Sequence, residues 1–182
     1  MEPIDPSLAR RTGQAPSSKH TDPKLSKHDK RVLVERLSKF AMFNRCSTDD
    51  LAALVDVGSS FVLPANWPLM LESTPAHTCY AITDGSAKVF INRVQVGELG
   101  PGDIVGEMAI LTGDLRRATV TSTTRLRGLR VDNTALVGLF ERRPQLLDVL
   151  RGAYVMHTPP SHRERIRDIL RAAAGGLAPV TA

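Results

Sequence analysis

The stretch GDIVGEMAILTGDLRRATV, residues 102–120, places one carboxylate and two guanidinium groups around short glycine turns. Glu107 directly follows Gly106, and Arg116 and Arg117 come nine and ten residues after Glu107. The run between the two glycine turns has room for only about two turns of helix, which is too short to be stable alone. The first turn of a helix carries unpaired N–H groups and a partial positive charge, and glycine lets a ligand come close to the main chain. The spacing therefore predicts an anion site.

The side chains around this turn indicate which anion it would take. Arg116 can fold back over the helix start and offer a fixed fork of donors to a phosphate. Glu107 repels a phosphate, but its carboxylate can accept a hydrogen bond from a neutral hydroxyl. Donors for a phosphate beside an acceptor for a hydroxyl group favour a sugar phosphate as the ligand. The alternatives are a solvated surface arginine, a helix-capping carboxylate and glycines that serve only as turns.

The elements that must position this stretch have the pattern of strands. Between residues 61 and 131, short apolar runs are separated by Pro, Gly, Asn or Asp about every ten residues, which is typical of a sandwich or barrel. The expected strands are the runs FVL, PLML, CYAI, AKVFI, VQVGEL, ATVTST and LRGLRV.

Helical spacing flanks the strands on both sides. A first helix is expected from Asp29, which is available as its cap, and a second has Ser47 or Thr48 as N-cap and Gly58 as its end. The helical period returns after the strands and is interrupted near Pro144. The expected organisation is a disordered basic tail at 1–28, one domain at 29–158 and a final basic helix and tail at 159–182, the domain comprising helices at 29–57, a barrel at 61–131 and a C-terminal helix at 132–157.

Composition limits the function further. The formal charge is +5 with a pI of about 9.6, but the excess of Lys and Arg lies in the first 31 and last 42 residues, so direct DNA binding is not expected. Cys46 and Cys79 have no CxxC spacing and make no disulfide framework. The chain has no signal-peptide core and no apolar run that could span a membrane, which favours a cytoplasmic location.

The same residues resemble a known family. LGPGDIVGEMAILTGDLRRATV is similar to the phosphate-binding cassette of cyclic-nucleotide-binding domains, found in catabolite activators, cyclic-nucleotide-dependent kinases and gated channels. YAITDGSAKVF resembles that family's strand-glycine-strand signature, and the likeness covers roughly residues 37–154. The resemblance implies a mainly β fold with flanking helices, a double-stranded β-helix or jelly-roll barrel with N-terminal helices and C-terminal hinge helices.

The resemblance also assigns roles to single residues. It places the cyclic phosphate on Arg116 and the ribose 2′-hydroxyl on Glu107, and it lines the cradle with the N–H groups of Gly106, Ala109 and Arg117. Candidates for a lid that stacks on the base are Tyr154, Met156 and His157, carried over the site by a hinge before Phe140. The whole expected ligand-binding set is Gly106, Glu107, Met108, Ala109, Arg116, Arg117 and Ala118.

Several positions depart from the family pattern. Asn66 and Ser73 stand where glycine is common, and the hairpin at Asn92 and Arg93 is short; these changes are expected to affect the distal barrel and to leave the cradle whole. Arg117 replaces a residue that is usually small, and it can crowd the pocket. A hydroxyl there accompanies preference for cyclic GMP, whereas arginine has donors only, so cyclic AMP is the expected ligand.

The sequence therefore predicts a cyclic-nucleotide sensor without a cofactor or catalytic site. No helix-turn-helix, kinase or channel segment is evident, so the signal is expected to pass to a separate effector protein or through self-association of the C-terminal helices. The alternative is a degenerate domain that keeps the fold but serves as a nucleotide-independent scaffold. The GxGxxxG string of Gly100, Gly102 and Gly106 is not followed by the long helix that a dinucleotide site needs. His77 is isolated among the strands, which argues against a metal site.

Overall fold

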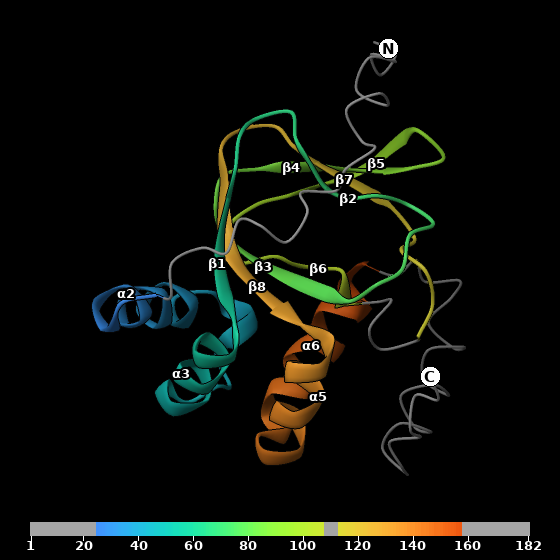
Figure 1. Ribbon diagram of the computed structural model, residues 1–182. Coiled ribbons are helices and arrows are strands. Elements are labelled where there is room, and N and C mark those ends of the chain that lie inside the picture. The colour runs from blue at the N-terminus through green and yellow to red at the C-terminus, as the bar shows by residue number, and fades with distance from the viewer. Residues whose placement is uncertain (1–24, 108–112, 158–182) are drawn as a thin grey trace.

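Two four-stranded antiparallel sheets face one another across the middle of the molecule (Figure 1). The computed structural model describes residues 25–107 and 113–157, with the side chains of 154–157 outside the description. The strands within these residues are β1 (Ser59–Leu63), β2 (Pro68–Met70), β3 (Thr78–Asp84), β4 (Ala87–Ile91), β5 (Val94–Leu99), β6 (Ile104–Val105), β7 (Thr119–Ser122) and β8 (Leu126–Asp132).

The strand orders are β1-β8-β3-β6 in the first sheet and β2-β7-β4-β5 in the second. Most neighbouring strands within a sheet are far apart in the chain, because the chain crosses repeatedly between the two packed sheets. This is the arrangement of a jelly roll. The expected fold class is confirmed. The sequence missed β6, because its two residues between glycine turns are too few to show an alternating pattern.

The β4–β5 hairpin has the shortest turn in the second sheet. Ile91 pairs with Val94, so only Asn92 and Arg93 connect the strands. Both have positive φ values, 50° and 67°, which is the backbone of a type I′ turn. Asparagine tolerates this region, but arginine has a Cβ that crowds the following carbonyl.

Two N-terminal helices precede the sheets. The N-cap of helix α2 (Lys27–Ser38) is Ser26, three residues before the expected cap Asp29. The Asp29 N–H donates to Ser26 Oγ over 3.2 Å and its carboxylate accepts from Ser26, a reciprocal capping box. After the short 3₁₀ helix η1 (Ala41–Phe43), helix α3 (Thr48–Val57) starts from the cap Ser47 and ends at Gly58, as expected.

Two C-terminal helices follow the sheets. Helix α5 (Asn133–Arg142) and helix α6 (Pro144–His157) are separated by Arg143, whose backbone leaves the helical region. The predicted break at Pro144 is therefore confirmed. Helix α5 runs without interruption through Phe140, so the expected hinge before that residue stays a prediction, and the break in this structure lies at Arg143. None of the helices in the described residues has the length and apolar composition needed to cross a membrane. The predicted basic helix after residue 158 lies outside the description.

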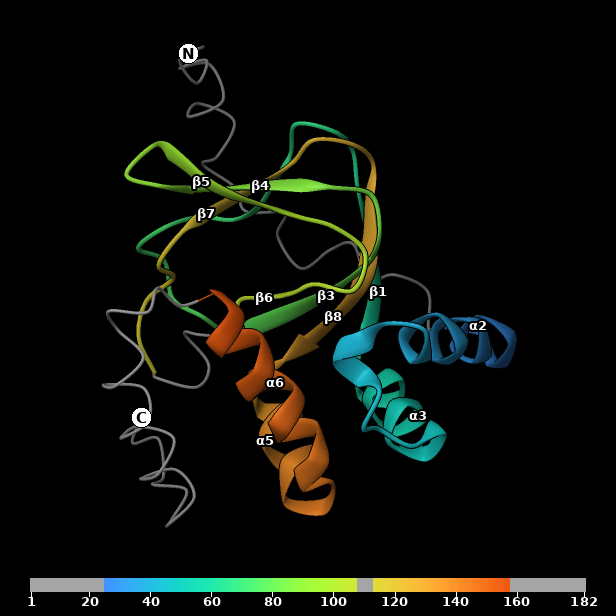
Figure 2. The ribbon, with the colours of Figure 1, turned by 180° about the vertical axis from the view of Figure 1, so that it is seen from behind.

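Of the helices in the described residues, α3, α5 and α6 pack on the outer face of the first sheet, away from the second sheet, and α2 packs against α3 (Figures 1 and 2). Strand β3 shows how this divides the core. Cys79 and Ala81 pack in a cluster with the helices, whereas Tyr80 and Ile82 pack between the two sheets. The space between the sheets is thus separated from the helical layer by β3 and its neighbours.

A buried carboxylate joins the N-terminal helices to the C-terminal hinge. Asp50 of α3 is 1% exposed and accepts hydrogen bonds from Arg143 over 2.8 Å and from the Gln145 amide over 3.0 Å. It also belongs to the Ser47 capping box. Burial raises the pKa of Asp50, but the bonds from Arg143, Gln145 and Ser47 together outweigh burial, so the net pKa is lowered and the group is ionised.

Candidate functional site

The backbone of Arg116 is fixed by the loop after β2. Its N–H donates to the Thr74 carbonyl and its carbonyl accepts from the Ser73 N–H, each over 2.8 Å. Ser73 holds a left-handed φ of 62°. The expectation that Ser73 affects only the distal barrel is therefore wrong: this turn holds the main chain of the arginine on which the predicted site depends.

The guanidinium of Arg116 is buried between the two sheets' edges and is 5% exposed. Its Nη1 donates to the Gly106 carbonyl over 2.9 Å. Its Nη2 donates to the Thr78 carbonyl and, over 3.2 Å, to the Thr78 hydroxyl. All these acceptors are neutral, and no carboxylate in the described parts of the chain forms an ion pair with Arg116.

Gly106 is required here by two independent constraints. Its φ of 90° lies in a region that residues with a Cβ rarely adopt. A Cβ at this position would also lie 2.3 Å from Arg116 Nη1 and 3.1 Å from the Thr78 carbonyl oxygen. The glycine predicted to admit a ligand thus makes space for the guanidinium itself.

Glu107 directly follows this glycine and is 1% exposed. Its charge acts on the pKa values of both Cys79 and Arg116, so its carboxylate lies within electrostatic reach of the arginine. The structure therefore brings together Gly106, Glu107 and Arg116, as expected from the sequence. The roles of these residues toward a ligand stay predictions, and Met108 and Ala109 lie outside the described residues.

Arg117 takes a different direction from its neighbour. Its Nη2 donates to Asp114 over 3.2 Å, and its side chain is 43% exposed. The expectation that Arg117 crowds the pocket finds no support in this conformation. Ala118 is half-buried and comes directly before β7.

The lid candidates Tyr154, Met156 and His157 lie on the last turns of α6. Their side chains are outside the description, so their predicted stacking role is untested. Their helix starts at Pro144, and its orientation is set by the bonds that Arg143 and Gln145 donate to Asp50.

Burial controls the ionisation of the groups around the arginine. It lowers the pKa of Arg116, although nearby Tyr80, Cys79 and Glu107 act in the opposite direction. Burial likewise raises the pKa of the Cys79 thiol to about 12, with a further contribution from Glu107. Arg116 remains charged at neutral pH because its ordinary pKa is so high. A buried, permanent cation is thus the main electrostatic feature of this region.

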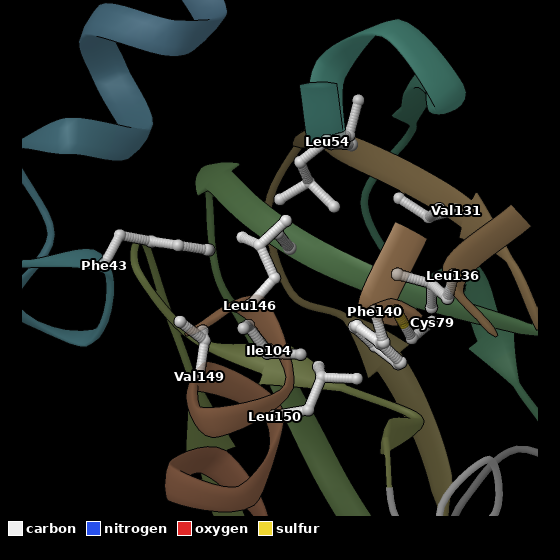
Figure 3. A pocket seen from close by; sticks show the side chains of 12 residues that line it. Phe43, Leu54, Cys79, Ile104, Val131, Leu136, Phe140, Leu146, Val149 and Leu150 are labelled. Atoms are coloured by element: carbon white, nitrogen blue, oxygen red, sulfur yellow. The ribbon is translucent and has the colours of Figure 1, made fainter. Parts of the chain in front are cut away.

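A small cavity on the helix-covered side of the first sheet is not this site (Figure 3). Its volume is about 20 Å³, and its lining is entirely apolar apart from the Cys79 thiol. Figure 3 shows Leu54, Phe140 and Leu146 pointing into it from three helices. A void of this size and character holds no polar ligand.

Both Cys46 and Cys79 are free thiols, as expected.

Two groups that contact Arg116 were missed from the sequence. Thr78 supplies two of its acceptors, and the Ser73–Thr74 turn supplies both partners of its main chain. These residues precede Arg116 by about forty positions and reach it only because the strands fold together. Their types carried no local signal that could have identified them.

Fold and site together define a class of protein: a jelly roll with a buried arginine at a glycine turn. Residues 61–143 match the family model of the cyclic nucleotide-binding domain. The resemblance seen in the sequence is thus confirmed for this part of the chain.

Similar proteins carry this domain within longer chains. The chain is 27% identical over 111 residues to a cyclic nucleotide-gated potassium channel of Mesorhizobium japonicum, a match that covers 60% of this chain and 30% of the channel. It is 25% identical over 121 residues to a CRP-like cAMP-activated global transcriptional regulator of Mycobacterium tuberculosis, covering 64% and 54%. The chain thus spans 54% of the length of the regulator and 30% of the length of the channel.

A solved structure shows the same fold. The regulatory domain of Toxoplasma gondii PKA with cAMP matches with a TM-score of 0.58 and 14% sequence identity, over 65% of this chain and 48% of that one. At this identity the similarity concerns the fold alone.

Proposed function

We propose that this chain is a cyclic-nucleotide sensor that binds cyclic AMP in preference to cyclic GMP. Arg116 binds the cyclic phosphate and Glu107 accepts a hydrogen bond from the ribose 2′-hydroxyl. The domain family supports a nucleotide ligand, and the relative in Mycobacterium tuberculosis is described as cAMP-activated. The remaining support comes from the chemistry of the two side chains.

The observation that carries the proposal is the buried guanidinium. Removing a cation from water is costly unless a counter-charge and good hydrogen bonds compensate. In the described residues Arg116 has three neutral acceptors and no ion pair. A phosphate monoanion would give the guanidinium a directly bonded counter-charge and would accept two parallel bonds from its fork.

Glu107 narrows the ligand to a nucleotide with a free sugar hydroxyl. A carboxylate accepts hydrogen bonds and repels phosphate, so it favours a neutral hydroxyl next to the anion. The choice of cyclic AMP rests on the residue type at Arg117: arginine has only donors, so this position offers no hydroxyl to accept from the exocyclic amine of guanine. Its pairing with Asp114 leaves that property unchanged.

The signal would leave through the C-terminal helices. Ligand capture draws Arg116 and Gly106 toward the phosphate, and the hinge at Arg143 lets α6 close toward the base. The output is a contact with a separate effector protein or self-association through these helices. Pull-down with the full chain, with and without cyclic AMP, tests for a nucleotide-dependent partner.

Calorimetric titration of the full chain with cyclic AMP and cyclic GMP tests the proposed ligand. We expect Arg116→Ala to weaken cyclic AMP binding by about 2 to 5 kcal/mol, because the phosphate loses a desolvated, charge-assisted partner. Glu107→Gln should cost less, and Arg116→Lys shows how much of the loss is due to the fork and how much to the charge. Arg125→Ala, which removes an exposed arginine after β7, is the matched control and should bind like wild type.

The alternative function is a nucleotide-independent scaffold with the same fold. Absence of both heat and thermal stabilisation with either nucleotide would favour it. Equal affinity of wild type and Arg116→Ala would remove the assignment of the phosphate to Arg116 while leaving nucleotide binding in place.

A further inference from the structure

Two hydroxyl groups on β3 extend the hydrogen-bond network of Arg116. Thr78 and Tyr80 are two residues apart and therefore lie on the same face of the strand. The Thr78 hydroxyl donates to the Tyr80 hydroxyl over 3.2 Å. The same Thr78 oxygen accepts from Arg116 Nη2, also over 3.2 Å. Thr78 is 8% exposed, so water cannot readily replace these partners. A chain of bonds therefore runs from the guanidinium through Thr78 to the phenol.

The direction of these bonds leaves one donor available. Thr78 uses its hydrogen toward Tyr80 and a lone pair toward Arg116. Tyr80 accepts the Thr78 hydrogen, and its own phenolic hydrogen donates to no group within the described residues. The ring is held in place by an edge-to-face contact with Phe61, with centroids 5.4 Å apart and planes at 81°. The phenol is thus a preorganised donor close to a buried cation.

The position of Tyr80 relative to the glycine turn places this donor at the predicted ligand site. Tyr80 pairs with Val105 across β3 and β6, directly before Gly106 and Glu107. Tyr80 packs in the cluster between the two sheets, on the side from which Arg116 reaches Thr78. Its electrostatic effect on the pKa of Arg116 agrees with this proximity.

We propose that Thr78 is a positioning residue for Arg116 and that Tyr80 is a ligand-contact residue, whose hydroxyl donates to an exocyclic oxygen of the cyclic phosphate. This inference rests on the proposed function. Thr78 holds the guanidinium in the geometry that receives the anion, and Tyr80 adds a neutral donor next to the charged fork. A phosphate oxygen that accepts from both has the short, charge-assisted bonds typical of buried anion sites.

Isosteric substitutions separate hydroxyl chemistry from packing. Tyr80→Phe and Thr78→Val each remove one hydroxyl while the shape is nearly retained, and each should weaken cyclic AMP binding about tenfold, the effect of one hydrogen bond to a charged group. Thr78→Ser keeps the hydroxyl and should bind within about twofold of wild type. Thr83→Val is the control, since Thr83 is a buried threonine of the same strand whose hydroxyl donates to the Arg127 carbonyl.

Phosphorothioate analogues of cyclic AMP test whether Tyr80 touches the phosphate itself. The Rp and Sp diastereomers replace one or the other exocyclic oxygen by sulfur, which is a weaker hydrogen-bond acceptor. If Tyr80 donates to one of these oxygens, Tyr80→Phe should weaken cyclic AMP and one diastereomer alike, and have little effect on the diastereomer that carries sulfur at the contacted position. A loss caused by general loosening of the site would be the same for all three ligands.

Calorimetry with wild type and the variants gives distinguishable outcomes. If wild type binds neither cyclic AMP nor cyclic GMP, the proposed function fails, and this inference fails with it. If wild type binds and both Tyr80→Phe and Thr78→Val stay within twofold of it, this inference alone is overturned. An equal loss of all three ligands in Tyr80→Phe would overturn the direct contact of Tyr80 with the phosphate.

Discussion

Gly106→Ala tests the geometry of the arginine site through the stability of the fold, without any ligand. The new methyl group would lie 2.3 Å from Arg116 Nη1, a distance that non-bonded atoms do not tolerate, and the backbone would keep a φ of 90°. The backbone strain costs about 1 to 2 kcal/mol for an L-residue. Displacing the guanidinium from the Gly106 carbonyl costs about 1.5 to 3 kcal/mol more, since it breaks a charge-assisted bond. The expected loss in the free energy of unfolding is therefore about 3 to 5 kcal/mol.

Gly113→Ala is the matched control. Gly113 also has a positive φ, 72°, but a Cβ there would meet nothing within 4 Å. Its substitution by alanine should cost only the backbone strain of about 1 to 2 kcal/mol. Urea unfolding followed by the fluorescence of Trp67, the single tryptophan, measures both variants. Equal destabilisation of the two would refute the idea that the guanidinium occupies the space beside Gly106.

Three further expectations concern the turn, the hinge and the thiols. Arg93→Gly should raise the free energy of unfolding by about 0.5 to 1 kcal/mol, because the relief of left-handed strain exceeds the cost of the extra chain entropy of glycine. Thermal unfolding measures this gain, with Arg93→Lys as the control. No gain in the glycine variant would contradict the type I′ turn. Because the pKa of Asp50 is lowered in the folded state, its stabilisation is present above about pH 4, its unfolded value, and is lost as the pH falls further. Urea unfolding from pH 7 to pH 3 should accordingly show a smaller acid loss in Asp50→Asn than in wild type, and parallel curves would contradict the buried network. Burial raises the pKa of Cys79 to about 12, so a thiol reagent at pH 8 should modify the partly exposed Cys46 well before Cys79 in the folded chain. In urea both thiols should react equally. Fast labelling of Cys79 in the folded chain would contradict its burial.

The sequence predicted those features that depend on neighbours in the chain. Gly106, Glu107 and Arg116 lie within one short stretch, so their spacing predicted that they lie together; the anion site that they would form stays a prediction. The strands were recognisable because each has its own apolar run bounded by turn residues. Ser47 and Gly58 likewise mark the ends of α3 through local hydrogen bonds and backbone freedom.

The features that depend on strand register or helix packing could not be predicted. Tyr80 comes close to the glycine turn only through its pairing with Val105, and no local pattern determines that register. Asp50 and Arg143 are 93 residues apart in the chain and meet because α3 packs beside α5. For the same reason an aspartate that resembled an ordinary first-turn residue in the sequence proved to be a buried contact of the hinge.

That aspartate sets a condition on how the domain can change shape. If α6 swung away while α3 stayed in place, Asp50 would be left as a buried anion without Arg143 and Gln145, at a cost of several kcal/mol. The less costly movement takes α3 and the hinge together as one rigid piece that slides over the first sheet. A displacement that begins at Arg116 would then move helices from both ends of the chain together, because α3 and α6 lie on the same side of the first sheet.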